Sequence, residues 1–121
     1  MELSKQVTSL ELSKRLKELG VKQESLFSWL KTPKEWRLVA SSPELEVRSF
    51  YVGKELASAF TVAELGEMLK ETRPELDNPF PSYGLITKRW FLLTEDGNIE
   101  AKTEANARAK TLIYLKENKL I

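Results

Sequence analysis

The stretch Ala-Phe-Thr-Val-Ala-Glu-Leu-Gly-Glu-Met-Leu, residues 59–69, predicts a helix together with the signal that starts it. Thr61 is a preferred N-cap residue, and Glu64 follows at the spacing of a capping box, in which each side chain accepts a backbone N–H of the other residue. Phe60 and Leu65 flank this start as the two partners of a hydrophobic staple. Apolar residues at helical spacing then predict the buried face, which consists of Val62, Leu65, Met68 and Leu69.

A second copy of this start signal lies nearer the N-terminus. Thr8 is the predicted N-cap, Glu11 its capping-box partner, and Val7 and Leu12 the staple pair. Gly20 is expected to end this helix, because glycine adopts the left-handed conformation beyond a helix C-terminus without strain. The predicted inner face consists of Leu12, Leu16 and Leu19.

Residues 22–30 predict a second, shorter helix. Pro33 lies just beyond it and discourages continuation, because proline lacks the N–H that a helix interior requires. The apolar stripe of this helix consists of Leu26, Phe27 and Leu30.

The chain then changes from helical to alternating periodicity. Residues 36–40 alternate as in a half-buried strand, residues 41–44 predict a turn, and residues 45–52 predict the returning strand of a hairpin. Residues 71–82 hold three of the five prolines and predict a stiff surface loop rather than a domain boundary.

The C-terminal third predicts a hairpin followed by a helix. Residues 83–94 are dense in aromatic and β-branched residues, and an Asp-Gly turn at 96–97 leads into a short strand. Thr103 is the predicted N-cap of the last helix. Lys116 falls on the inner face of that helix, so its side chain is expected to snorkel. The rest of this face consists of Ala105, Ala109, Leu112, Ile113 and Leu115.

The elements follow in the order α-α-β-β-α-β-β-α and predict one α+β domain over residues 1–121. Because the strands occur in hairpins, we expect a mainly antiparallel sheet of roughly four strands. The helices are expected to cover one face of this sheet.

The chain contains no histidine and no cysteine. It therefore lacks an imidazole base, a thiol nucleophile and the ligands of a zinc finger. Its serines have no histidine partner, and its glycines are scattered singly rather than in a phosphate-binding loop. These absences predict a protein that is not an enzyme and that uses no metal ion or cofactor.

Three carboxylates lie on one face of the helix that starts at Thr61. Glu64, Glu67 and Glu71 have a spacing that an acid–base pair or a hard cation could use. Glu64 is already assigned to the capping box, and no Asp-x-Asp loop supports a metal site. The favoured interpretation is a solvated helix face.

The formal net charge is +1, so bulk electrostatics selects no partner. The longest run without a charged residue is residues 78–87, which contains two prolines and cannot form a transmembrane helix. Without cysteine the chain needs no oxidising compartment. We therefore expect a cytoplasmic protein that does not contact the membrane.

The segment Leu12–Leu30 supports a nucleic-acid alternative. Two helices joined at Gly20 have the layout of a helix-turn-helix, whose second helix would enter the major groove while the following hairpin acts as a wing. An ordinary helical hairpin that ends at a glycine explains the same pattern. In the alternative, the contacts come from Lys22, Gln23, Ser25, Ser28 and Arg37.

Most aromatic residues lie in patterned apolar segments and are expected in the core, although they would also suit a stacking platform for single-stranded nucleic acid. Tyr51 and Trp90 are expected to be partly exposed. Large aromatic side chains in such positions anchor many protein interfaces, so these two are the predicted interface residues.

Three segments taken together resemble a group of small proteins encoded in phages, prophages and other bacterial mobile regions. These segments are Leu10–Trp29, Ala59–Leu69 and Lys102–Ile121, and they cover a little under half of the chain. The resemblance implies an origin in a phage or mobile element. It implies no activity, and it assigns no site residue.

The sequence thus predicts a non-enzymatic accessory protein of a phage or mobile element that acts through protein contacts, with homodimerisation as one form of contact. The alternative is a winged-helix-like protein that binds nucleic acid through the segment Leu12–Leu30.

Overall fold

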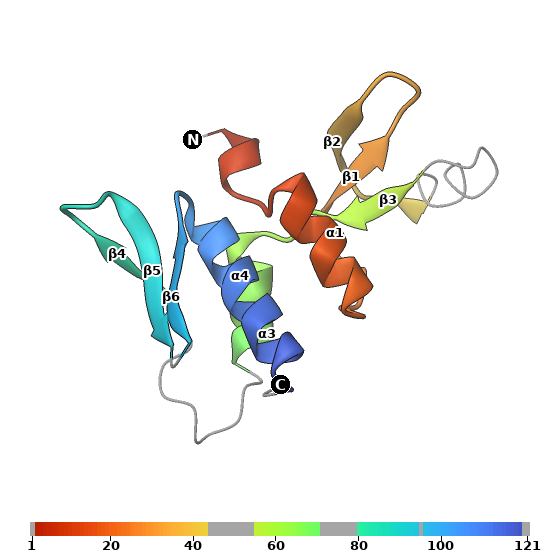
Figure 1. Ribbon diagram of the computed structural model, residues 1–121. Coiled ribbons are helices and arrows are strands. Elements are labelled where there is room, and N and C mark those ends of the chain that lie inside the picture. Colours follow the sequence, from red (N-terminus) through yellow and green to blue (C-terminus); the bar gives the residue numbers. More distant parts are fainter. Residues whose placement is uncertain (1, 44–54, 71–79, 95, 120–121) are drawn as a thin grey trace.

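The computed structural model describes residues 2–43, 55–70, 80–94 and 96–119. Within these ranges, three α-helices lie between two antiparallel sheets of three strands each (Figure 1). The predicted α+β class is confirmed. The prediction of one sheet with roughly four strands is wrong, and the predicted order of elements is not matched.

Helix α1 spans Leu10–Glu18 and starts one residue later than predicted. Its N-cap is Ser9, whose hydroxyl accepts the N–H of Leu12 at 3.4 Å. The prediction that Thr8 caps this helix is wrong, because Thr8 is buried and its hydroxyl bonds to other groups.

The C-terminus of α1 confirms the role predicted for Gly20. This glycine has a φ of +84°, and its N–H donates to the carbonyl of Lys17 at 3.1 Å. The N–H of Val21 donates to the carbonyl of Leu16, also at 3.1 Å. This pair of bonds is a Schellman motif, and it brings Leu16 and Val21 into the core side by side.

The first sheet has the strand order β2-β1-β3, with both pairs antiparallel. Its strands are β1 (Phe27–Lys31), β2 (Trp36–Ala40) and β3 (Leu56–Ser58). Strand β2 confirms the strand predicted at 36–40, although its observed partner is β1. The returning strand predicted at 45–52 lies outside the described residues.

The helix predicted at residues 22–30 is wrong, because residues 27–31 form the central strand of the first sheet. The apolar spacing from Leu26 to Leu30 covers little more than one helical turn, which is too short to hold a helix by itself. As a strand, β1 forms ladders with β2 on one side and β3 on the other, so its backbone groups are satisfied from both directions. Tertiary pairing therefore overrides the local pattern.

The second sheet has the order β4-β5-β6 and is also antiparallel. Its strands are β4 (Ser82–Gly84), β5 (Arg89–Thr94) and β6 (Gly97–Ala101). The single strand predicted at 83–94 is thus interrupted by a turn. Gly97, the glycine of the predicted Asp-Gly turn, has a φ of +120° and begins β6, where it pairs with Thr94. The strand therefore starts inside the predicted turn.

The helices α3 (Val62–Leu69) and α4 (Glu104–Glu117) confirm the predictions for both segments. Thr61 and Glu64 form the capping box, and Thr103 caps α4. Helix α4 packs against α3 and α1 on one side and against β5 and β6 on the other. The buried core lies between the three helices and consists of Leu16, Val21, Phe60, Leu65, Leu69, Ala105, Ala109, Leu112, Ile113 and Leu115.

A hydrogen-bond relay at Thr8 connects segments that are far apart in the sequence. The 3-10 helix η1 (Leu3–Lys5) leads into this residue, which is fully buried. The N–H of Phe60 donates to Thr8 Oγ1 at 3.1 Å, and Thr8 Oγ1 contacts Ser13 Oγ. Ser13 Oγ donates to the carbonyl of Ser9 at 2.7 Å.

The backbone of Thr8 makes two further long-range bonds. Its N–H donates to the carbonyl of Phe60 at 2.9 Å, and its carbonyl accepts the indole N–H of Trp29 at 2.9 Å. Thr8 therefore joins α1, the central strand β1 and the residue that leads into α3.

We predict that Thr8→Val lowers the free energy of unfolding by about 1–3 kcal/mol, because the buried N–H of Phe60 loses its hydroxyl acceptor while the side-chain volume is kept. Urea denaturation measures this change. Thr8→Ser is the matched control, since it keeps the hydroxyl and loses only a methyl group. A larger loss for the serine variant than for the valine variant would contradict the role of the hydroxyl.

Arg108 lies between α3 and α4, where it packs on Gly66. Its Nη1 donates to the carbonyl of Val62 at 3.1 Å, and its Nη2 lies 3.6 Å from Glu104 Oε1. The guanidinium carbon is 5.2 Å from the centroid of the Phe80 ring. A Cβ atom on Gly66 would overlap Arg108 Nη1, so this position in α3 has room only for glycine while the arginine stays in place.

We predict that Gly66→Ala changes the free energy of unfolding with opposite sign in two backgrounds. In the natural chain the substitution lowers the free energy of unfolding by about 1 kcal/mol, because the added methyl group displaces the Arg108 guanidinium from the carbonyl of Val62. In an Arg108→Ala background it stabilises by about 0.5–1 kcal/mol, because alanine is the better helix former. Urea denaturation of the four proteins tests this, and the same sign in both backgrounds would contradict it.

Candidate functional site

The turn between β4 and β5 presents two adjacent aliphatic side chains to solvent. Leu85 is 84% exposed and Ile86 is 97% exposed. The turn is closed by the N–H of Lys88, which donates to the carbonyl of Gly84 at 2.8 Å, and Lys88 adopts a positive φ of 55°. A Cβ atom on Gly84 would lie 2.5 Å from Thr87 Oγ1, so glycine allows the close approach inside the turn.

The predicted interface residue Trp90 lies next to this turn. It pairs with Tyr83 across β4 and β5, and the two ring centroids are 5.4 Å apart. Trp90 is half-buried and, with Val62 and Lys102 among other residues, lines a small pocket of about 300 Å³. Tyr51, the other predicted interface residue, lies outside the described residues.

We call the exposed apolar region at this end of the molecule the hairpin surface, and it consists of Tyr83, Leu85, Ile86 and Trp90. In Figure 1, β4 forms the outer edge of its sheet, and no described strand pairs with that edge. An open strand edge beside exposed aliphatic side chains is a surface at which a protein partner can add contacts.

The sequence predicts Trp90 as an interface residue, but it does not indicate the exposure of Leu85 and Ile86. Both residues fall inside the strand predicted at 83–94, where alternation assigns them to a continuous ladder. The signal that could have separated them is Gly84, since an isolated glycine within a strand pattern indicates a bend or a turn.

The five residues of the nucleic-acid alternative do not lie on a helix in the structure. Lys22 Nζ pairs with Glu24 at 3.1 Å, and Arg37 Nε lies 3.4 Å from Glu35 Oε1. Ser28 is buried in β1.

The two remaining residues of that set also bond within the chain. Gln23 accepts the N–H of Ser58 at 2.8 Å, and Ser25 donates to Glu64 at 2.7 Å. The helix-turn-helix expected over Leu12–Leu30 is therefore wrong, because its second helix is replaced by a strand between two others.

Of the three carboxylates predicted on one helix face, Glu64 has a structural role. Its Oε1 accepts the backbone N–H of Thr61 at 2.8 Å and the hydroxyl of Ser25 at 2.7 Å. Its Oε2 accepts the N–H of Leu26 at 3.1 Å. Glu64 thereby joins the start of α3 to the segment that enters β1.

The other two carboxylates are not part of that arrangement. Glu67 is exposed and pairs with Lys70 at 3.0 Å, and Glu71 lies outside the described residues. Among the residues that the structure describes, no group of three or more acidic side chains is placed to hold a metal ion.

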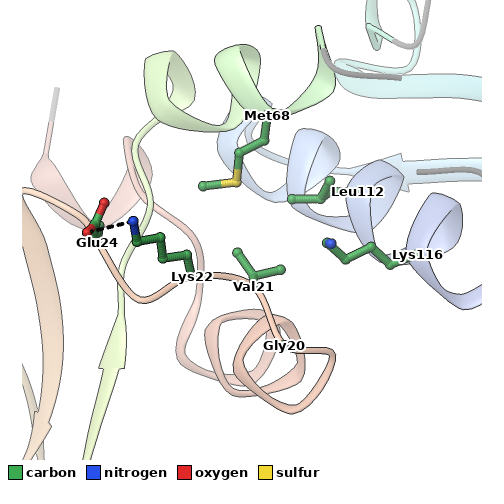
Figure 2. A pocket seen from close by; sticks show the side chains of 7 residues that line it. All are labelled: Gly20, Val21, Lys22, Glu24, Met68, Leu112 and Lys116. Atoms are coloured by element: carbon green, nitrogen blue, oxygen red, sulfur yellow. Dashed lines mark ion pairs between the residues drawn. The ribbon is translucent and has the colours of Figure 1, made fainter. Parts of the chain in front are cut away.

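A pocket of about 380 Å³ lies where the end of α1 meets α3 and α4 (Figure 2). Met68 reaches it from α3, Leu112 and Lys116 from α4, and Val21 and Lys22 from the segment after α1. Its wall is partly apolar and partly polar, because Glu24 and the two lysine side chains border it together with the apolar residues. The sequence predicts Lys116 and Leu112 on the inner face of α4. It does not indicate the pocket, because the other lining residues come from α3 and from the segment after α1.

Within the described ranges, no helix is both long and apolar enough to cross a membrane. Comparison of the chain with family models, with curated proteins and with solved structures finds no match.

We predict that Glu64→Ala lowers the free energy of unfolding by about 2–3 kcal/mol, because three donors in two segments lose a charged acceptor. Glu67→Ala is the matched control on the same helix. It should change the free energy of unfolding by less than about 0.5 kcal/mol, because exposed ion pairs contribute little to stability. Urea denaturation of both variants checks this. Equal losses would contradict the structural role of Glu64.

Proposed function

We propose that the protein is a non-enzymatic accessory protein of a phage or other mobile element that acts through protein contacts, and that a second copy of the chain binds its hairpin surface. The mobile-element origin rests on the resemblance of the three helical segments. The observation that carries the protein contact is the nearly complete exposure of Leu85 and Ile86 at the tip of the β4–β5 turn.

The burial of these side chains supplies the driving force. Fully burying a leucine or isoleucine contributes roughly 1.5–3 kcal/mol, so four such residues in a twofold dimer contribute roughly 6–12 kcal/mol. Association costs an estimated 4–15 kcal/mol in lost translational and rotational freedom, which is a cost of the same size, so these four side chains by themselves support only a weak dimer.

A twofold arrangement also suits the chemistry of the surface. In such a dimer each patch meets its own copy, and apolar patches need no opposite charge to do so. The outer edge of β4 lies beside the patch and pairs with no described strand, so its backbone groups can serve for strand pairing with a second copy. The second sheet also carries charges of both signs, since Arg89 Nε on β5 lies 3.6 Å from Glu100 Oε2 on β6.

The nucleic-acid alternative requires a second helix that enters the major groove, but residues 27–31 form a strand instead. Lys22 and Arg37, the two cations of that alternative, are each paired with a carboxylate. Binding of duplex DNA that weakens steeply with added salt would favour that alternative over the dimer.

We predict that the protein dimerises at about 10–100 µM and that the double variant Leu85→Ser/Ile86→Ser stays monomeric, because both apolar anchors are lost. Sedimentation-velocity centrifugation over this range measures the oligomeric state. Circular dichroism checks the fold, which these exposed positions should leave unchanged.

Leu26→Ser is the matched control for the dimer. Leu26 is also an exposed leucine, at 68%, but it lies before β1 and not on the hairpin surface. This variant should dimerise like the natural chain. A natural chain that is monomeric throughout the range, or a hairpin variant that still dimerises, would refute the proposed contact.

A further inference from the structure

We propose that the pocket between the end of α1, α3 and α4 binds a small carboxylate with an apolar body, and that Lys116 pairs with the carboxylate group. This site is independent of the hairpin surface. Its volume of about 380 Å³ falls within the usual range of small-molecule sites, about 300–1,000 Å³.

The apolar part of the pocket is formed by the core itself. Leu112 is fully buried and Val21 is 7% exposed, and both belong to the central cluster. Met68 packs against that cluster from α3, and its unbranched thioether side chain can adjust to the shape of a ligand. Because Leu112 and Val21 lie almost entirely below the surface, Met68 provides most of the apolar surface that a ligand can reach among these three side chains, which Figure 2 shows around the pocket.

The two cations at the pocket differ in their surroundings. Lys22 is largely exposed, and its ammonium is paired with Glu24 at 3.1 Å. Lys116 is half-buried on α4, and in Figure 2 its side chain points toward Leu112 and Val21. Within the described ranges, its ammonium has no ion pair and no hydrogen bond.

The nearest acidic residue in the sequence does not neutralise Lys116. Glu117 follows it on α4 but lies 3.6 Å from Arg15 on α1. The carbonyl end of the helix favours a cation in this last turn, which explains why a lysine is tolerated there. It does not supply a counter-ion, so the pocket retains one uncompensated positive charge beside an apolar wall.

This combination selects the ligand class. A monoanionic carboxylate matches one free ammonium, and a charge-assisted hydrogen bond between them is stronger than a neutral one. A phosphate ester would normally require several donors, such as an arginine fork or successive backbone N–H groups, and none of the described residues that line the pocket is an arginine. The apolar wall then adds affinity for the body of the ligand rather than for its head.

The test is a titration of the full chain, labelled with ¹⁵N, with decanoate below its critical micelle concentration. We expect saturable amide shifts centred on Val21, Met68 and Leu112. The uncharged analogue 1-decanol has the same chain and should bind at least about tenfold more weakly, because it cannot pair with the ammonium.

Two variants locate the charge. Lys116→Gln keeps most of the aliphatic stem and should weaken decanoate binding by about tenfold while leaving decanol binding unchanged. The double variant Lys22→Gln/Glu24→Gln is the matched control, because it removes both charges of the pair together, and it should change decanoate binding by less than about twofold.

Three results would overturn the proposal. These are amide shifts that do not saturate or that lie away from the pocket, equal affinities for decanoate and decanol, and an unchanged decanoate affinity in Lys116→Gln. None of them bears on dimerisation through the hairpin surface, so failure here is distinguishable from failure of the proposed function.

Discussion

The hydrogen-bond relay at Thr8 is the constraint on which the rest of the structure depends. One fully buried residue uses its N–H, its carbonyl and its hydroxyl to join α1, β1 and Phe60, which precedes α3. Because a buried polar group is costly unless each of its bonds is formed, these contacts favour one relative position of the three segments. The first sheet therefore lies against α1, and the core closes between the helices.

The two small sheets lie on either side of the helices, and each is held in place by different contacts. The first sheet is held by long-range pairing of β1 with β3, and Glu64 ties its entry to the cap of α3. The second sheet is built from strands adjacent in sequence and contacts α4 through β5 and β6. The edge strand of this sheet, β4, lies on the side away from the helices (Figure 1), and the turn that follows it is exposed.

The hairpin surface and the Lys116 pocket show two ways in which a chain without histidine or cysteine can recognise other molecules. The hairpin surface is apolar and lies at a strand edge with which no described strand pairs, which suits a macromolecular partner. The pocket has a partly apolar wall and one unpaired cation, which suits a small anion with an apolar body. Neither surface depends on the other, since they are built from different elements.

The sequence by itself determined the features that depend on a few neighbouring residues: the capping box of α3, the glycine end of α1, the Thr103 cap of α4 and the hairpin of β5 and β6. Caps and tight turns are local because their hydrogen bonds join residues close in the chain. Only the tertiary structure decided that residues 27–31 form a central strand, that Thr8 is buried while Ser9 caps α1, that Leu85 and Ile86 are exposed, and that Lys116 lines a pocket. Those outcomes depend on partners far away in the sequence, such as Thr8 with Phe60 and β1 with β3, and local periodicity carries no record of such pairs.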